Sequence, residues 1–359
     1  ERLRNRSRKR LGSEFAMPVT IKDVAKRADV SITTVSHVIN KTRFVSEELI
    51  KRVEAAIEEL HYQPSPLGRG LRKGQTYTIA VLLPDPGNPF FQMVARGIEE
   101  QTYQHNFTIT SCNTDEDPER EESCLSLLHR RGIDGFIVAP TTKGNENLRS
   151  LIEEGIPLVL IDRYNPRLAV NQVYSANRKG GYIATEHLVS LGHERIGVLV
   201  GIRGLKPIED RLEGYRSALR DKAIDIDESL IMSAYSKIEE GFSATRQLLE
   251  EHPKVSAIFS TNNMMTLGAL KYFKQAGIHC PQDVSLIGFD DSEWAGISTP
   301  ALTVVAQQAY EMGYRAGELL FETINGQRER KRARKIKLET NLIIRESTAT
   351  STRISRLRR

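Results

Sequence analysis

Residues 20–46 of the 359-residue chain read TIKDVAKRADVSITTVSHVINKTRFVS. The spacing of the apolar residues in this stretch predicts two short helices and the start of a third. Thr20 and Ser31 are suitable N-caps for the first two helices, and Ser46 opens the third. The residues predicted to face a common core are Ile21, Val24, Ala25, Ala28, Val35, Val38, Ile39, Ile50, Val53, Ile57 and Leu60. The residues predicted to face outward on the second helix are Ile32, Thr33, Ser36 and His37. Residues 17–62 are therefore expected to form a compact three-helix unit.

The second predicted helix follows a tight turn and carries small polar residues on its outer face. This arrangement is typical of a helix-turn-helix, in which the second helix enters the major groove of DNA. An ordinary three-helix bundle would show the same apolar spacing, so the pattern alone leaves both interpretations open. The residue types favour DNA: Thr and His can hydrogen-bond base edges, and Arg can form a bidentate contact with guanine.

Three short sequence segments in this region closely resemble the headpiece of the lactose/galactose repressor family of bacterial transcriptional regulators. They are TIKDVAKRA at 20–28, VSITTVSHVIN at 30–40 and FVS at 44–46. The resemblance implies a helix-turn-helix headpiece whose DNA-contacting residues are Ser31, Ile32, Thr33, His37 and Arg43. It also implies a homodimer that binds a pseudo-palindromic operator in double-stranded DNA. Ile32 departs from the polar residues common at its position in the family, so the operator sequence stays open.

Residues 63–75 contain QPSPLGRGLRKG at 63–74, which is rich in proline, glycine and basic residues and predicts a linker. A plain flexible tether is one interpretation. The family resemblance implies a hinge helix that folds on DNA together with its partner's hinge, with Leu71 inserted between base pairs in the minor groove and Arg72 beside it. Such a wedge unstacks a base step and kinks the duplex. Gly68 and Gly70 lower the helix propensity of this segment, so we expect it to fold only on DNA.

Residues 76–347 alternate apolar runs of strand type with helical stretches. The predicted strands lie at 79–83, 107–110, 135–138, 158–161, 196–200, 257–259 and 286–287. Continuous apolar strands between helices predict parallel sheets covered on both faces. The length favours two doubly wound subdomains over one open sheet, and a polar break near Asn165–Gln172 disfavours a (β/α)8 barrel. The predicted fold class is thus α/β: a three-helix headpiece followed by a two-lobed body of doubly wound parallel sheets.

Several of these predicted strands end in polar or aromatic residues, where ligands of such sheets collect. Aromatic faces beside hydrogen-bonding groups suit a sugar, because its C–H faces pack on rings while each hydroxyl needs a donor and an acceptor. Taken singly, each residue is more simply explained as core or as a salt bridge. The candidate effector-binding set is Asn88, Phe90, Phe91, Asp162, Arg163, Arg211, Tyr235, Asn262, Asp290 and Gln307.

This set resembles, position by position, the pocket of the ribose-binding protein, a periplasmic sugar-binding protein of the same two-lobed fold. The resemblance implies a small sugar as effector, ribose or a related pentose. Tyr235 stands where that protein has phenylalanine, which can change the preferred sugar. A purine, a hexose or a protein corepressor remains an alternative effector, and a pure sugar-binding receptor remains an alternative function.

Charge and terminal segments complete the domain plan. Residues 17–75 hold 10 Lys and Arg against 7 Asp and Glu, whereas residues 76–345 hold 31 against 36, which suggests a polyanion-binding head on an acidic body. Residues 1–16 carry six basic residues and are interpreted as a translated cloning linker or a disordered basic segment, with a natural phosphate-binding arm as the alternative. Residues 348–359 are expected to form a disordered tail, and the basic stretch Arg328–Lys337 a solvated loop.

Other function classes lack support in the sequence. The three cysteines are widely spaced, which excludes a CxxC metal site and favours a reducing compartment. The sequence shows no GxSxG, HExxH or Walker motif, so neither catalysis nor a cofactor is predicted. It also shows no apolar run of membrane-spanning length and no signal peptide, so a cytoplasmic location is expected.

Overall fold

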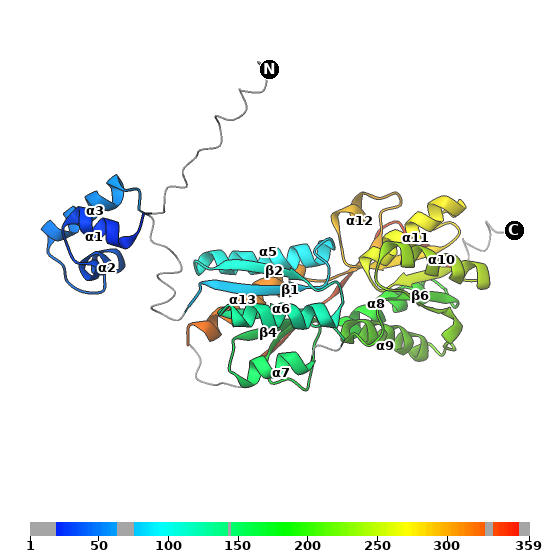
Figure 1. The fold of residues 1–359 in the computed structure, drawn as a ribbon. Helices are drawn as coiled ribbons and strands as arrows, with labels where there is room; N and C mark the ends of the chain where they lie inside the picture. The colour runs from blue at the N-terminus through cyan, green and yellow to red at the C-terminus, as the bar shows by residue number, and fades with distance from the viewer. Residues whose placement is uncertain (1–18, 63–74, 143–144, 327–332, 352–359) are drawn as a thin grey trace, which may run out of the picture. The chain divides into compact units, whose positions relative to one another are not determined.

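The computed structural model describes residues 19–62, 75–142, 145–326 and 333–351, which fall into two compact units. The first unit, here called the head, lies within residues 1–76, and the second, the body, lies within residues 77–359. Figure 1 shows the helices of the head in blue and the body in cyan to red. Among the helices of the described residues, none is both long and apolar enough to span a bilayer.

The head contains the three predicted helices, α1 (Ile21–Ala28), α2 (Ile32–Asn40) and α3 (Glu47–Glu59). Its centre is formed by the fully buried Val24, Val35 and Val53, one from each helix. One expectation about this unit is wrong: Ser36 is buried rather than outward. The helix α2 packs on both α1 and α3, so its covered sector is wide enough to include the residue next to Val35.

The amino-terminal lobe of the body is built on a parallel sheet with the order β11-β5-β4-β3-β1-β2. Its strands are β1 (Thr78–Leu83), β2 (Thr108–Asn113), β3 (Gly135–Val138), β4 (Leu158–Ile161), β5 (Asn171–Ser175) and β11 (Lys335–Leu338). Its helices are α5 (Pro89–Gln104), α6 (Pro118–Arg130), α7 (Asn145–Glu153) and α13 (Ala309–Ile324). In Figure 1 the orange α13 lies among the cyan and green elements of this lobe, where it packs on α5.

The carboxy-terminal lobe has a sheet with the order β12-β10-β9-β8-β6-β7, in which only β12 is antiparallel to its neighbour. Its strands are β6 (Ile196–Val200), β7 (Ile231–Ser233), β8 (Ala257–Ser260), β9 (Ser285–Phe289), β10 (Thr303–Ala306) and β12 (Asn341–Ile343). Its helices are α8 (Asn177–Ser190), α9 (Lys206–Asp221), α10 (Ile238–Glu251), α11 (Asn263–Ala276) and α12 (Glu293–Ile297), with the 3-10 turn η1 (Glu228–Leu230). The prediction of two doubly wound lobes is confirmed.

The two lobes repeat one strand order, so β4 of the first corresponds to β9 of the second. The chain crosses between lobes three times, after β5, after β10 and after β11. The expected break at Asn165–Gln172 is therefore too early. The strand β5 begins at Asn171, and the buried Gln172 exchanges hydrogen bonds of 2.7 and 2.8 Å with the backbone of Asn165. The segment is polar because the Gln172 side chain satisfies the backbone of the loop at Asn165, and not because the chain leaves the lobe there.

Two expectations about the end of the chain also need correction. The stretch Arg328–Lys337 is not all loop, because β11 starts at Lys335 and alternates exposed with half-buried residues; residues 328–332 lie outside the described residues. The tail expected at 348–359 is ordered over 348–351. There the Ala349 carbonyl oxygen lies 2.9 Å from His193 Nε2, and the Ser351 N–H donates to the Leu191 carbonyl. These residues are ordered because their backbone groups hydrogen-bond to His193 and to the Leu191 carbonyl on the surface of the lobe.

Candidate functional site

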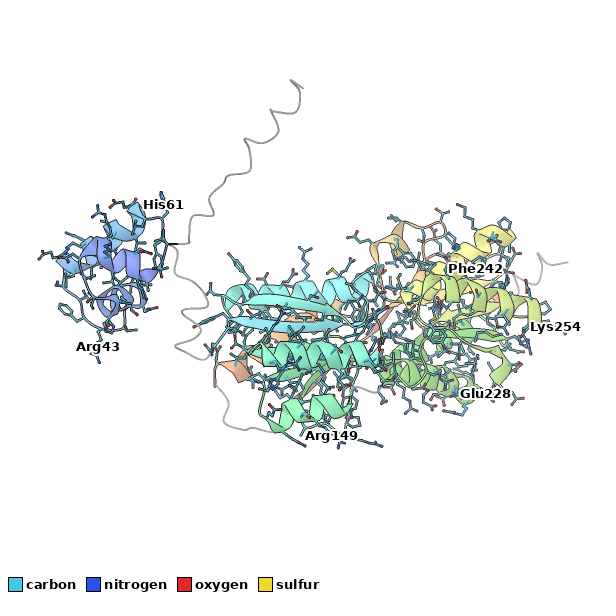
Figure 2. All side chains as sticks on the ribbon, in the orientation of Figure 1. Arg43, His61, Arg149, Glu228, Phe242 and Lys254 are labelled. Atoms are coloured by element: carbon cyan, nitrogen blue, oxygen red, sulfur yellow. The ribbon has the colours of Figure 1, made fainter. Side chains whose placement is uncertain are left out.

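The outer surface of α2 and the loop after it form the first candidate site, here called the recognition surface. Ile32 is 42% exposed, and Thr33 and Arg43 are exposed. Figure 2 shows Arg43 at the edge of the head. Phe44, which the sequence reasoning did not select, is 97% exposed beside Arg43. Ile32, Thr33 and Arg43 are thus accessible to solvent, as is this additional aromatic ring.

Two of the expected DNA contacts have structural roles within the head. The Ser31 side chain accepts a hydrogen bond of 3.0 Å from the Thr34 N–H, which makes it the N-cap of α2. The half-buried His37 holds its ring through a 2.7 Å hydrogen bond between Nδ1 and Thr42 Oγ1. Leu71 and Arg72 of the expected hinge lie outside the described residues.

The second candidate site is a cleft in the body, at the carboxyl ends of the parallel strands. It has a volume of about 680 Å³, including its open mouth, and all ten residues of the predicted effector set line it. Nine further lining residues were missed by the sequence reasoning: Pro84, Asp85, Asp115, Glu116, Leu205, Pro207, Ile208, Ser236 and Lys237. Pro207 and Ile208 lie in the first turn of α9 and the others lie in loops, where nothing in their residue types distinguishes them from ordinary surface residues.

Two aspartates occupy equivalent places in the two lobes. Asp162 directly follows β4 and Asp290 directly follows β9, and both have left-handed backbones with φ of 61° and 73°. In each case the backbone N–H donates over 2.9 Å to the next strand, to Val173 and Val305 respectively. The same turn at the end of equivalent strands therefore brings one buried carboxyl to the cleft from each lobe.

The cleft holds two buried arginines whose charges are already engaged. Arg163 pairs with Glu116 through hydrogen bonds of 2.5 and 2.8 Å and also donates to the Pro140 carbonyl. Arg211 donates to Asn177 Oδ1 and to the Thr261 carbonyl, at 2.8 and 2.7 Å. These contacts fix both guanidinium groups in place before any ligand arrives.

The face of Arg211 is engaged as well as its edge, because its guanidinium carbon lies 3.6 Å above the centre of the Phe289 ring. Burial raises the pKa of Asp162, while Arg163 and Arg211 oppose that rise. Burial also raises the pKa of Asp290, opposed by Arg211 and by the hydrogen bond from Gln307. Arg211 therefore links the two carboxyl groups electrostatically.

Two buried acceptor atoms of the cleft have no hydrogen-bond partner among the described residues. They are Asp162 Oδ1 and Gln307 Oε1. A buried acceptor without a donor costs free energy, so both atoms favour a ligand that carries O–H or N–H groups. Next to them Phe90 and Phe91 meet edge to face, with ring centroids 5.0 Å apart. Tyr235 contributes least to the interior, because 70% of it is exposed.

Two contacts join the lobes across the cleft. Asn88 Oδ1 accepts hydrogen bonds from the Phe90 N–H and from Asn263 Nδ2, and Asn263 belongs to the other lobe. At the mouth, Lys237 Nζ lies 3.7 Å from Asp115 Oδ1. The lobes therefore meet through polar groups around the cleft.

Within the described ranges, no group of three or more His, Cys, Asp or Glu residues could hold a metal ion.

Comparisons with known proteins match this arrangement. The family model "Bacterial regulatory proteins, lacI family" matches residues 20–65, and "Periplasmic binding protein-like domain" matches residues 185–348. The chain is 36% identical to the ribose operon repressor of Halalkalibacterium halodurans, over 92% of this chain and 97% of that protein. It is 34% identical to the HTH-type transcriptional repressor PurR of Photobacterium profundum, over 91% of this chain and 98% of that protein.

Solved structures of LacI family regulators are also similar to this chain. A LacI family transcriptional regulator from Enterococcus faecium with bound ribose has a TM-score of 0.69 and 31% identity, and the match covers 76% of this chain and 99% of that one. The lac repressor dimer bound to operator and the anti-inducer ONPF has a TM-score of 0.81 and 26% identity, covering 92% of this chain and 99% of that one.

Proposed function

Because the chain belongs to the LacI family of bacterial regulatory proteins and is a DNA-binding transcriptional repressor, we propose that it represses a sugar-utilisation operon. We propose further that its effector is a small neutral sugar, ribose or a related pentose, which binds in the cleft of the body. The observation that carries the effector proposal is the pair of orphaned acceptors, Asp162 Oδ1 and Gln307 Oε1, beside an aromatic pair. Sugar hydroxyls donate to such acceptors, and sugar C–H faces pack on rings.

The charges of the cleft support a neutral ligand over an anionic one. Five acidic residues line it (Asp85, Asp115, Glu116, Asp162 and Asp290) against three basic ones (Arg163, Arg211 and Lys237). Arg163 is paired with Glu116, and Asp290 and Asp162 both interact electrostatically with Arg211. A phosphate or carboxylate would therefore meet a predominantly acidic surface, whose buried cations already face acidic side chains. The relative named as a ribose operon repressor and the ribose-bound structure add support for a pentose.

On the DNA side, we propose that Ile32, Thr33, His37 and Arg43 contact the operator from the recognition surface, and that Ser31 contributes at the start of α2. Leu71 is assigned the minor-groove wedge and Arg72 the adjacent backbone contact. A homodimer presents two such heads to the halves of a pseudo-palindromic site. This assignment is supported by the exposure of the recognition surface and by the family match over residues 20–65.

Effector and operator are proposed to be linked through the lobes. A sugar held by both lobes stabilises one lobe arrangement, and in a dimer that arrangement sets the separation of the two hinges. We propose that the sugar lowers operator affinity. The contacts Asn88–Asn263 and Asp115–Lys237 support this coupling, since the cleft is lined from both lobes. The repressor is further proposed to act on the chromosome in the cytoplasm, and to have no catalytic activity.

A second effector class is favoured by one observation, the 34% identity to a repressor named PurR. A purine base would stack on the aromatic pair of the cleft and use the same acceptors through its N–H groups. The two classes differ in the donors they present, so direct binding separates them.

The experiment is calorimetric titration of the full chain with D-ribose, other pentoses, hexoses, hypoxanthine and ribose 5-phosphate. We expect saturable heat with ribose or another pentose and none with the phosphate ester. Operator fragments selected from random duplex DNA are then titrated with and without the best ligand. Binding only to hypoxanthine would refute the sugar assignment and leave the repressor assignment intact, whereas tighter operator binding with sugar would reverse the proposed direction of control.

A further inference from the structure

We propose that Thr42 is a positioning residue for operator recognition, which fixes the ring of His37 so that Nε2 is the nitrogen presented to a base edge. The proposal rests on the assignment of His37 as a base contact. It adds a residue outside the contact set derived from the sequence.

The backbone at the end of α2 brings the two side chains together. The helix ends at Asn40, and the C-cap Lys41 adopts the left-handed conformation with φ of 51° and ψ of 39°. Its N–H donates to the His37 carbonyl, and the following Thr42 N–H points to the same carbonyl oxygen at 3.4 Å. A left-handed residue at a helix end folds the chain back over the last turn. Thr42 is thereby placed against a residue five positions earlier.

The side-chain contact is short. Thr42 Oγ1 lies 2.7 Å from His37 Nδ1, at the lower end of the range for hydrogen bonds. With Nδ1 engaged, Nε2 is the ring nitrogen left for DNA, and in the part of the chain that the structure describes it has no hydrogen-bond partner. The contact also fixes rotation about the side-chain bonds, because the ring cannot turn without breaking it.

The direction of this hydrogen bond sets the chemistry of the free nitrogen. In neutral imidazole one nitrogen is a donor and the other an acceptor. If the Thr42 hydroxyl donates to Nδ1, Nε2 carries the hydrogen and donates to an acceptor such as guanine O6 or N7. If Nδ1 donates to Thr42, Nε2 accepts, for example from an adenine or cytosine amino group. Because a hydroxyl can donate or accept, Thr42 serves either tautomer; what the contact fixes is the orientation in which Nε2, and not Nδ1, faces the base edge.

A purely structural role for this hydroxyl is disfavoured by its surroundings. Thr42 is exposed, so its hydroxyl could be solvated by water without a partner in the protein. The turn is already closed by backbone hydrogen bonds from Lys41 and Thr42. The hydrogen bond between Thr42 and His37 therefore mainly orients the His37 ring and contributes little to the stability of the head.

The test uses the full chain and a pool of random-sequence duplex DNA, from which bound sequences are selected and read. The variants are Thr42→Val, which keeps the shape and removes the hydroxyl, Thr42→Ser, which keeps the hydroxyl, and Thr42→Ala as a second removal. His37→Ala measures the contribution of the ring itself. Ser46→Ala is the matched control, because it removes an exposed hydroxyl of the head whose side chain makes no capping hydrogen bond.

We expect Thr42→Val and Thr42→Ala to relax base preference at the one position in each half-site that His37→Ala also relaxes. Operator affinity should fall about 5- to 100-fold, which corresponds to one ordinary hydrogen bond in each of two half-sites. Thr42→Ser should restore both readouts, and Ser46→Ala should change neither. Binding to unrelated duplex DNA should stay constant in all variants, which separates lost specificity from an unfolded head.

Three results would overturn the proposal. Unchanged base preference in both Thr42→Val and Thr42→Ala would show that the hydroxyl does not act through His37. A loss in Thr42→Ser equal to that in Thr42→Val would assign the effect to the methyl group. If His37→Ala itself left the selected sequence unchanged, the base contact of His37 would fail, and with it the role of Thr42.

Discussion

At the residue scale, the cleft depends on two buried aspartates held in left-handed turns at equivalent strand ends. Their positions after β4 and β9 were readable from the sequence, because each follows an apolar run. The charged residues that surround these aspartates could not all be predicted from the sequence. Glu116, which pairs with Arg163, lies 47 positions away in sequence. The same limit applies to Asp115 and Lys237, which approach from different lobes.

Removing either buried charge should weaken effector binding. We expect Asp162→Asn and Asp290→Asn to lower affinity for the sugar about 10- to 100-fold, since hydrogen bonds to charged groups contribute about 1.5 to 3 kcal/mol. Operator affinity without sugar should not change. The matched control is Asp291→Asn, an adjacent carboxylate that pairs with Arg345 and does not line the cleft. Titration calorimetry measures the result, and an equal loss in the control would contradict the assignment.

His193 gives the body a pH dependence of known sign. Its Nε2 lies 2.9 Å from the Ala349 carbonyl, which can only accept, and its Nδ1 lies 2.8 Å from Ser256 Oγ. The neutral ring with hydrogen on Nε2 satisfies both contacts. Burial lowers the pKa of His193 below its usual 6.5, so between that value and the folded-state pKa the unfolded chain binds more protons. The free energy of unfolding should therefore fall as pH decreases below about 6.5.

The variant His193→Gln isolates this contribution, because glutamine can still donate to Ala349 but does not titrate. We expect a smaller loss of stability in the variant than in the parent chain on acidification, measured by denaturant unfolding at a series of pH values. The buried acids Asp162 and Asp290, whose raised pKa values act in the opposite direction, are present in both proteins and cancel in the comparison. Identical slopes would refute the role of the imidazole.

At the element scale, the helices next to the cleft pack closely through glycines. A side chain at Gly181 of α8 would approach the backbone oxygen of Arg211 to 2.0 Å, and one at Gly214 of α9 would approach the Arg178 carbonyl to 2.2 Å. Glycine is needed at both points because the two helix backbones nearly touch. This contact sets the height of Arg211 above the Phe289 ring.

Gly181→Ala should therefore disturb both stability and binding. We expect a loss of about 1 to 3 kcal/mol in the free energy of unfolding from overpacking, together with weaker sugar binding because α9 and Arg211 must shift. Gly296→Ala on the exposed helix α12 is the control, since its added methyl would meet nothing closer than 4.0 Å and alanine favours a helix. Thermal unfolding and calorimetry measure both effects. A stable Gly181→Ala protein with unchanged affinity would contradict this account.

The elements themselves were predictable to different degrees. Helices α1 and α2 and the central strands of each lobe have strong local signals: caps, apolar periodicity or continuous apolar runs. The strands β5, β11 and β12 do not, because their sequences are polar or alternate and they gain order from neighbouring strands. In β11, Lys335 and Lys337 are exposed at a sheet edge, and only the pairing with β5 identifies the segment as a strand.

At the scale of the whole molecule, the head and the body are separate compact units, each with its own hydrophobic core. A ligand of the body should therefore stabilise only the body. With sugar at 100 times its dissociation constant, we expect the body's unfolding transition to gain about 2.7 kcal/mol, while the transition of the head stays in place. Differential scanning calorimetry of the full chain, with Asp290→Asn as the variant of reduced affinity, measures both. A shift of the head alone would place the ligand elsewhere.

The sequence by itself determined the three-helix head and the two-lobed α/β body, because these depend on local periodicity, caps and apolar runs, and its resemblance to a sugar-binding pocket identified the ten residues that meet in the cleft. Only the tertiary structure decided which charges those residues meet, how the last residues of the chain are held, and that Thr42 reaches His37. These features depend on side chains that are brought together across the lobes, or on the left-handed backbone turn at Lys41, which the residue types there do not predict. Contacts between distant segments are set by packing, and packing exists only once the chain has folded.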